Sequence, residues 1–260
     1  MREGYMIPLK IININRMKKI YLLLITLLIV CTISCTSFKN SVEPVIIERV
    51  VVCQQDGYFM GWPANNGIWM WKDGEIMVGF TRGQFVIKSG SHNIDPPHES
   101  MLARSYDGGF SWHAFKPKGF VGDSSLVLKD LKEPLNFMDE NFALRIVGVT
   151  YHGSKVPEGG FFYSYDRGNS WEGPFAFKGF SDAEELGNME ITGRTEYLVV
   201  SKDSALLFLG AMKGLVHSDK PFVAQTTDGG LSFEFLGWIV DTSKPFRAIM
   251  PDAVKTFTGK

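Results

Sequence analysis

Residues that could carry out acid–base chemistry are concentrated between Arg82 and Glu99. This stretch also contains His92, Asp95 and His98, and it follows directly on an apolar run. Connections of this length between strands are unusual and are often functional. A carboxyl group and cations held together on one loop could protonate a leaving group and bind an anionic substrate. We therefore treat this stretch as the candidate site.

The same stretch has a second interpretation as a solvated loop with no ligand. Asn93 and Asp95 are among the residues that form turns most readily, because their side chains bind nearby backbone amides. His92 could tune Asp95 or bind a sugar hydroxyl, or it could be incidental. The sequence leaves both interpretations open.

A motif that occurs three times indicates the fold around this stretch. It reads Ser-x-Asp-x-Gly-x-Ser-Trp in residues 105–112 and 164–171, with a weaker copy in residues 226–233. Recurrence about every 60 residues indicates a repeat architecture. An Asp close to a Gly forms a tight turn, since the carboxylate folds back onto backbone amides. We expect Asp107, Asp166 and Asp228 to be structural rather than catalytic.

Apolar segments precede each motif, and short turns separate them. The first unit has a hairpin signal, an apolar run on either side of Asp73-Gly74. Helix-period runs of useful length are absent, which predicts an all-β meander of four-stranded sheets, one per motif. The expected strands are Val45–Cys53, with Cys53 buried, then Ile68–Trp71, Glu75–Phe80, Phe142–Tyr151, Phe161–Tyr163, Tyr197–Val200, Ala205–Gly210 and Phe222–Gln225.

Composition and the N-terminus bear on location. The formal net charge of −1 and the lack of a basic stripe argue against a nucleic-acid partner. Lys18-Lys19 followed by the apolar run 20–30 and by Cys35 resembles a bacterial lipoprotein signal, with Met17 as the true start. We expect a signal peptide over 1–35, lipid on Cys35, a tether over 36–44 and a folded region over 45–260. An ordinary secretory peptide and a single membrane anchor are the alternatives.

The three motifs resemble the Asp-boxes, or bacterial neuraminidase repeats, of sialidase-type β-propellers. Four further segments are similar to bacterial secreted sialidase-like proteins: residues 59–69, 92–95, 191–197 and 248–251. The resemblance covers residues 45–260 and implies a six-bladed ring of four-stranded blades. At about 60 residues a unit, the chain would supply about three to four blades, so we expect an incomplete, C-terminally truncated propeller.

The resemblance implies an exported glycoside hydrolase that acts on a glycan ending in sialic acid or a related acidic sugar, without metal or cofactor. Asp95 matches the acid/base. Arg194 matches an arginine that clamps the sugar carboxylate, with Glu190 or Glu196 beside it to orient a partner. Glu190 is then the second catalytic candidate and Glu196 a substrate-binding one, and a salt bridge at the rim is the alternative for Arg194. Further candidates for substrate binding are Arg82, His92 and Arg247, while Trp62 and Trp69 could stack on a sugar or belong to the core.

Two departures from the family pattern favour another class of function. Gly61-Trp62-Pro63 stands where sialidases commonly carry Arg-Ile-Pro, and neither Tyr151 nor Tyr197 obviously supplies the nucleophilic tyrosine. The rival hypothesis is a non-catalytic propeller on the cell surface that binds carbohydrate or acts as a scaffold. A third hypothesis is a truncated product without a stable fold.

Overall fold

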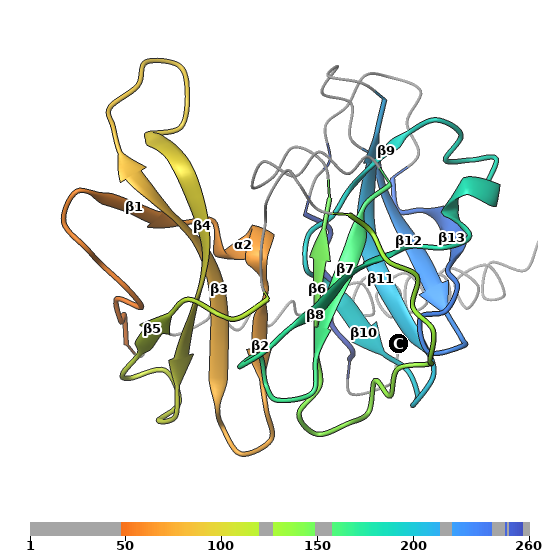
Figure 1. Ribbon diagram of the computed structural model, residues 1–260, viewed down its shortest axis with the longest axis horizontal. Helices are drawn as coiled ribbons and strands as arrows, with labels where there is room; N and C mark the ends of the chain where they lie inside the picture. The colour runs from red at the N-terminus through yellow and green to blue at the C-terminus, as the bar shows by residue number, and fades with distance from the viewer. Residues whose placement is uncertain are drawn as a thin grey trace, which may run out of the picture. The chain divides into compact units, whose positions relative to one another are not determined.

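The computed structural model describes residues 48–119, 127–148, 158–213, 220–240, 248 and 250–256 of the chain. The described residues from Val50 onward belong to one compact unit. Antiparallel β-sheet dominates the described residues, and the helices among them are two single turns, α2 (Pro63–Asn66) and the 3-10 helix η1 (Phe180–Asp182). The prediction of an all-β fold is confirmed (Figure 1).

The first sheet contains the predicted hairpin around Asp73-Gly74. Its strands are β1 (Tyr58–Gly61), β2 (Ile68–Met70), β3 (Ile76–Phe85), β4 (Ile94–Ser105) and β5 (His113–Phe115). The order is β1-β3-β4-β5, and β2 pairs with β3 beyond the end of β1. Strands β1 and β2 are therefore two halves of one inner strand, interrupted by α2 (Figure 1).

The other two sheets follow the same plan. The second sheet has the order β6 (Ala143–Val147), β7 (Gly160–Ser164), β8 (Glu172–Ala176). In the third, β9 (Glu190–Thr192) and β10 (Tyr197–Val199) both pair with β11 (Ala205–Met212), which leads to β12 (Lys220–Thr226) and β13 (Glu234–Trp238). The prediction of four strands per motif is thus confirmed for the first and third sheets, when β1 with β2, and β9 with β10, are each counted as one inner strand. The second sheet has three strands in the described residues.

The strand expected over Val45–Cys53 is wrong in its described part. Residues 48–53 are not in a strand, and Cys53 is half-buried rather than buried. Val52 and Cys53 instead pack from outside on a cluster that contains Val78 and Phe80. β-branched residues favour a strand where they pack on a pleated, half-buried surface, whereas Val50 and Val51 are exposed and the inner edge of β3 is already paired with β1 and β2.

The three motifs form the same turn. In the first, the Ser111 hydroxyl donates to Asp107 Oδ2 at 2.6 Å, the Ser111 amide donates to Oδ1 at 2.9 Å, and the Gly109 amide donates to Ser105 Oγ at 2.8 Å. Corresponding bonds surround Asp166 and Asp228, at 2.5 to 3.0 Å. The indole of Trp112 then donates to Gly109 O at 2.8 Å, beneath the turn. The carboxylates are fully engaged as structural acceptors.

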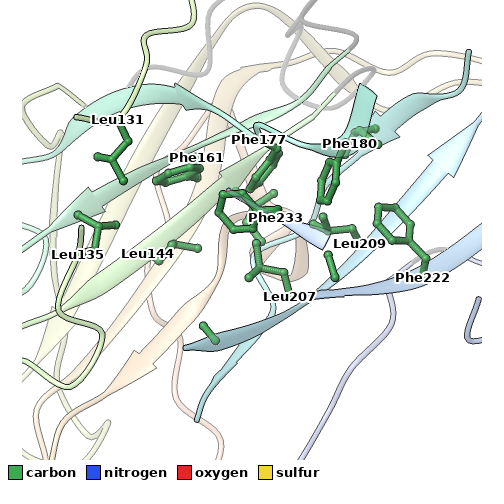
Figure 2. Packing of buried hydrophobic residues seen from close by; sticks show 14 of the residues in the cluster. Leu131, Leu135, Leu144, Phe161, Phe177, Phe180, Leu207, Leu209, Phe222 and Phe233 are labelled. Atoms are coloured by element: carbon green, nitrogen blue, oxygen red, sulfur yellow. The ribbon is translucent and has the colours of Figure 1, made fainter. Parts of the chain in front are cut away.

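Two apolar clusters hold the sheets together. One lies among the second and third sheets and the segments that connect them, with Phe161, Phe177 and Phe233 in contact at ring-centroid distances of 5.0 to 5.6 Å (Figure 2). The other joins the first two sheets, where Trp69 and Trp171 lie 5.6 Å apart. Each fully buried aromatic contributes about 2 to 3 kcal/mol through removal of apolar surface from water. Three antiparallel meanders packed in this way form an incomplete β-propeller.

Candidate functional site

The stretch from Arg82 to Glu99 is mostly strand, which corrects the prediction of one long loop. Strand β3 continues to Phe85, and β4 begins at Ile94. The register shifts between Arg82 and Gln84, where Gly83 allows a close approach: a Cβ at Gly83 would lie 2.8 Å from Asp95 O. The sequence did not reveal these strands because polar residues weaken the alternation of apolar and polar side chains that is typical of a strand. The bulge at Gly83 places Asp95 opposite Gln84.

Arg82 is paired with a carboxylate of its own sheet. It faces Glu99 across the strands, with Nη2 2.5 Å and Nε 2.7 Å from Oε2, and Lys116 Nζ lies 3.2 Å from Oε1. The hydrogen bond from Arg82 holds the pKa of Glu99 below its usual range, against the effect of burial. To clamp a substrate carboxylate, Arg82 would first have to leave Glu99.

Asp95 lies next to a cation, as the sequence analysis expected of this stretch. Its half-exposed carboxylate forms an ion pair with Lys88 Nζ, which also donates to Ile94 O at 2.8 Å. Asn93 acts as a turn former, since its Oδ1 accepts from the Lys88 amide at 2.9 Å. Asp95 stands near the start of β4, at the end opposite the Asp-box that follows β4. The carboxylate is therefore held by a short hairpin rather than by a free loop.

Trp62 provides an aromatic surface next to this hairpin. The rings of His92 and His98 stand edge-on to it, with centroids 5.1 and 6.3 Å away. Its backbone has a φ of 59°, a conformation in which bulky residues are strained, and Asn66 Nδ2 donates to its carbonyl at 2.9 Å. Trp69, in contrast, is 6% exposed and belongs to the core. Of the two tryptophans, Trp62 is the one that lies beside the Asp95 hairpin.

Three arginines are buried among the described residues, Arg104, Arg145 and Arg194, and the sequence analysis singled out only Arg194. Arg194 is 3% exposed and donates from Nη1 to Gly193 O at 2.9 Å. Arg145 in β6 is fully buried and donates to Asn66 Oδ1 at 3.2 Å and Ser100 Oγ at 3.4 Å. Burial lowers the pKa of Arg145 to about 9. The sequence feature that could have identified Arg145 is its position as the single charged residue inside the apolar run 143–147.

Glu190 and Glu196 lie at different points of the split inner strand of the third sheet. Glu190 begins β9, opposite Met212, and Glu196 lies between β9 and β10. Glu196 lines a pocket of about 290 Å³, which we call the Glu196 pocket, formed by Ile68, Trp69, Met70, Trp71, Asp139, Phe142, Thr195, Glu196 and Tyr197. Burial, followed by the negative charge of Asp252, raises the pKa of Glu196 to about 7.

The Glu196 pocket and Asp95 are at different ends of the first sheet. Trp69, in the pocket wall, pairs with Met77, whereas Asp95 pairs with Gln84. At the rise of a β-strand, these two points on β3 are separated by about 23 Å. Asp95 and Glu196 therefore do not act on the same small ligand.

A hydrogen-bonded tyrosine and glutamate occur in the second sheet. Tyr163 donates to Glu172 Oε2 at 2.9 Å. Burial, and then the hydrogen bond to Glu172, raise the pKa of Tyr163 above its usual range. The phenol is thereby kept protonated and is a poor nucleophile.

Some predicted features lie outside the described residues, among them Arg247, Tyr151 and the lipidation site Cys35. Within the described ranges, no group of three or more His, Cys, Asp or Glu side chains is arranged to hold a metal ion. No helix in that part of the chain is long and apolar enough to cross a membrane. The lipid anchor stays a prediction.

Known proteins were compared with the chain at the levels of sequence and structure. No protein-family model and no curated protein matches it. The structure is similar to that of an α-L-arabinanase from Penicillium chrysogenum complexed with arabinobiose, with a TM-score of 0.40 and 14% identity over 68% of this chain and 49% of the other. Two structures of an α-L-arabinofuranosidase from Fusarium graminearum with an iminosugar inhibitor, one of them a mutant, have TM-scores of 0.40 and 0.39 at 18% and 19% identity.

The Fusarium matches cover 68% of this chain and 48% of the other chains, so this chain spans about half the length of the solved structures that it matches. The names of those proteins are those of glycoside-cleaving enzymes. At these scores the likeness concerns the fold, and it assigns no role to any residue of this chain.

Proposed function

We propose that this protein is a sialidase-like propeller of the glycoside hydrolase class, which acts on terminal sialic acid or a related acidic sugar with Asp95 as the acid/base. The observation that carries the proposal is the grouping of Asp95 with Lys88, next to the Trp62–His92 ring pair, at the end of the first sheet away from its Asp-box.

Each of these groups has a use in glycoside cleavage. A carboxyl group can protonate the departing glycosidic oxygen and later activate water. Lys88 would supply a positive charge to a sugar carboxylate. The indole of Trp62 offers an apolar face to the sugar ring. Arg194 is buried, so the proposal gives it no step in the reaction.

The test is release of the fluorophore from a fluorogenic sialoside by the purified full chain. Replacement Asp95→Asn should lower kcat by about 100-fold or more, because general acid catalysis contributes at least that factor. The matched control is Asp182→Asn, since Asp182 is exposed and its carboxylate accepts from the neighbouring Ser181 hydroxyl. Equal release by the two variants would remove Asp95 from the mechanism.

A specific observation favours the non-catalytic alternative. The charge of Arg82 is taken up by Glu99, and Gly61 occupies the place of a clamp arginine. A propeller with this arrangement would bind a glycan without cleaving it. Retention of the chain on an immobilised sialylated glycan, with no fluorophore released from the sialoside, would favour this alternative.

A further inference from the structure

We propose that the Glu196 pocket is a second ligand site, which binds a small organic ammonium ion and is separate from the Asp95 site. The pocket has a volume of about 290 Å³ and is lined by residues of the first and third sheets together with Asp139 and Phe142. This volume lies near the lower end of the range for small-molecule sites.

Aromatic side chains form much of the pocket wall. Trp69 is held in place because its Nε1 donates to Leu144 O at 3.3 Å, and Phe142 is buried beside it. The electron-rich faces of such rings attract cations. Trp71 already shows this attraction, since the guanidinium carbon of Arg167 lies 5.5 Å from its ring centroid. That guanidinium is bound to Asp73 and Glu75, and Arg167 is not among the residues that line the pocket.

Carboxyl groups give the pocket its negative character. Glu196 and Asp139 line it, and Asp252 is close enough to Glu196 to share a hydrogen bond with it. Two neighbouring carboxyl groups cannot both ionise without a cost in free energy, and that cost is relieved by a proton or by a cation. Burial and Asp252 raise the pKa of Glu196 to about 7, so near neutral pH a bound cation would take the place of the proton.

The remaining polar groups of the pocket are neutral. Tyr197 accepts from the Leu144 amide at 3.3 Å, and burial raises its pKa to about 12. Thr195 Oγ1 accepts from the Ile146 amide at 3.2 Å. The rings of Trp69, Trp71 and Phe142 offer no oxygen ligands for a hard metal cation, and the described residues contain no set of three His, Cys, Asp or Glu side chains that could hold one. An organic ammonium ion suits carboxylates and ring faces together.

The test compares choline with its neutral isostere 3,3-dimethylbutanol. Each is titrated into the full chain while the heat of binding is recorded, together with tryptophan fluorescence, to which Trp69 and Trp71 of the pocket contribute among the six tryptophans of the chain. Choline should bind and the alcohol should not. The affinity for choline should rise as the pH increases through about 7, because binding releases the proton of Glu196. Equal binding of the two compounds, or no binding of choline, would overturn the proposal.

Variants locate the site. Glu196→Gln should weaken choline binding by about tenfold or more and abolish its pH dependence, since a charge-assisted contact is lost. Asp252→Asn should also weaken it, whereas Glu234→Gln, an exposed position on the same sheet, should not. An equal loss of choline affinity in Glu196→Gln and Glu234→Gln would contradict the proposed site. If Glu196→Gln fails to melt cooperatively, the test rests on choline binding by Asp252→Asn and on the pH dependence of choline binding by the unchanged chain.

The Asp95→Asn variant separates this proposal from the proposed function. It should bind choline as the unchanged chain does, because Asp95 and the pocket are at different ends of β3. Loss of choline binding in this variant would contradict a separate site, whatever its effect on sialoside cleavage.

Discussion

At the scale of single residues, the surroundings of an aspartate decide what it can do. Asp107 accepts hydrogen bonds from the hydroxyls of Ser111 and Ser105 and from two backbone amides. These bonds lower its pKa to about 2, the Ser111 hydroxyl contributing most. A carboxyl group held ionised in this way cannot serve as a general acid near neutral pH. Asp95 is held differently, by an ion pair with Lys88 instead of by the hydrogen bonds of an Asp-box turn.

The Asp-box carboxylates make stability depend on pH in a defined window. The folded-state pKa of Asp107 is depressed from 3.8, so its contribution is present above about 4 and is lost as the pH falls toward 2. Replacement Asp107→Asn removes the titration, and we expect the melting temperature to fall less steeply between about pH 4 and 2 than in the unchanged chain.

Melting curves followed by circular dichroism at several pH values measure this difference. The variant Asp182→Asn should keep the original steepness, because Asp182 is exposed and its carboxylate accepts a hydrogen bond from the adjacent Ser181 hydroxyl. Parallel pH profiles for the unchanged chain and Asp107→Asn would show that the bonds to Asp107 carry no net stability.

At the scale of elements, a buried ion network fastens the β2–β3 turn to the second Asp-box. Arg104 of β4 is ion-paired with Glu75, and its Nη2 donates to Arg167 O at 2.6 Å. The side chain of Arg167 in turn forms ion pairs with the turn: its Nη1 lies 2.5 Å from Asp73 Oδ2 and 2.7 Å from Glu75 Oε2. The turn of one sheet and the Asp-box of the next are thus positioned by shared charges.

Removal of the Glu75 charge should be costly. Glu75 and Arg104 are 7% and 5% exposed, so Glu75→Gln leaves a buried guanidinium without its carboxylate. We expect a loss of about 3 kcal/mol or more in the free energy of unfolding, measured by urea denaturation. Lys132→Ala breaks an exposed pair with Asp130 and should change little. Similar urea midpoints for the two variants would contradict this account.

At the scale of the whole molecule, the second and third sheets meet backbone to backbone. A Cβ at Gly148 would lie 2.2 Å from Gly193 N and 2.7 Å from Ile191 O, and one at Gly193 would lie 2.3 Å from Ile146 Cγ2. Nothing larger than glycine fits at this crossing without a shift of the backbone. The apolar cluster that these sheets share depends on that approach.

The variant Gly148→Ala should therefore destabilise the chain. We expect a loss of about 1 to 3 kcal/mol, the usual cost of overpacking, as a lower melting temperature with a cooperative transition. The control Gly237→Ala adds a Cβ in β13 where no atom lies within 4 Å, and it should be neutral. An unchanged melting temperature in Gly148→Ala would mean that the two strands can separate without loss.

The sequence by itself determined the local parts of this protein. The three Asp-boxes and the hairpin at Asp73-Gly74 have the predicted form because their hydrogen bonds join residues no more than four positions apart. Such bonds depend on residue type and spacing alone. The all-β class followed from the repeat and from the lack of helical periodicity.

The tertiary structure decided the pairings between distant residues. It joined Arg82 to Glu99, buried Arg145 against Asn66, and brought Asp252 to Glu196. It also left residues 48–53 outside the sheets, despite their β-branched side chains. Which carboxylate meets which cation depends on strand register and on the packing of whole sheets, and neither follows from residue types along the chain.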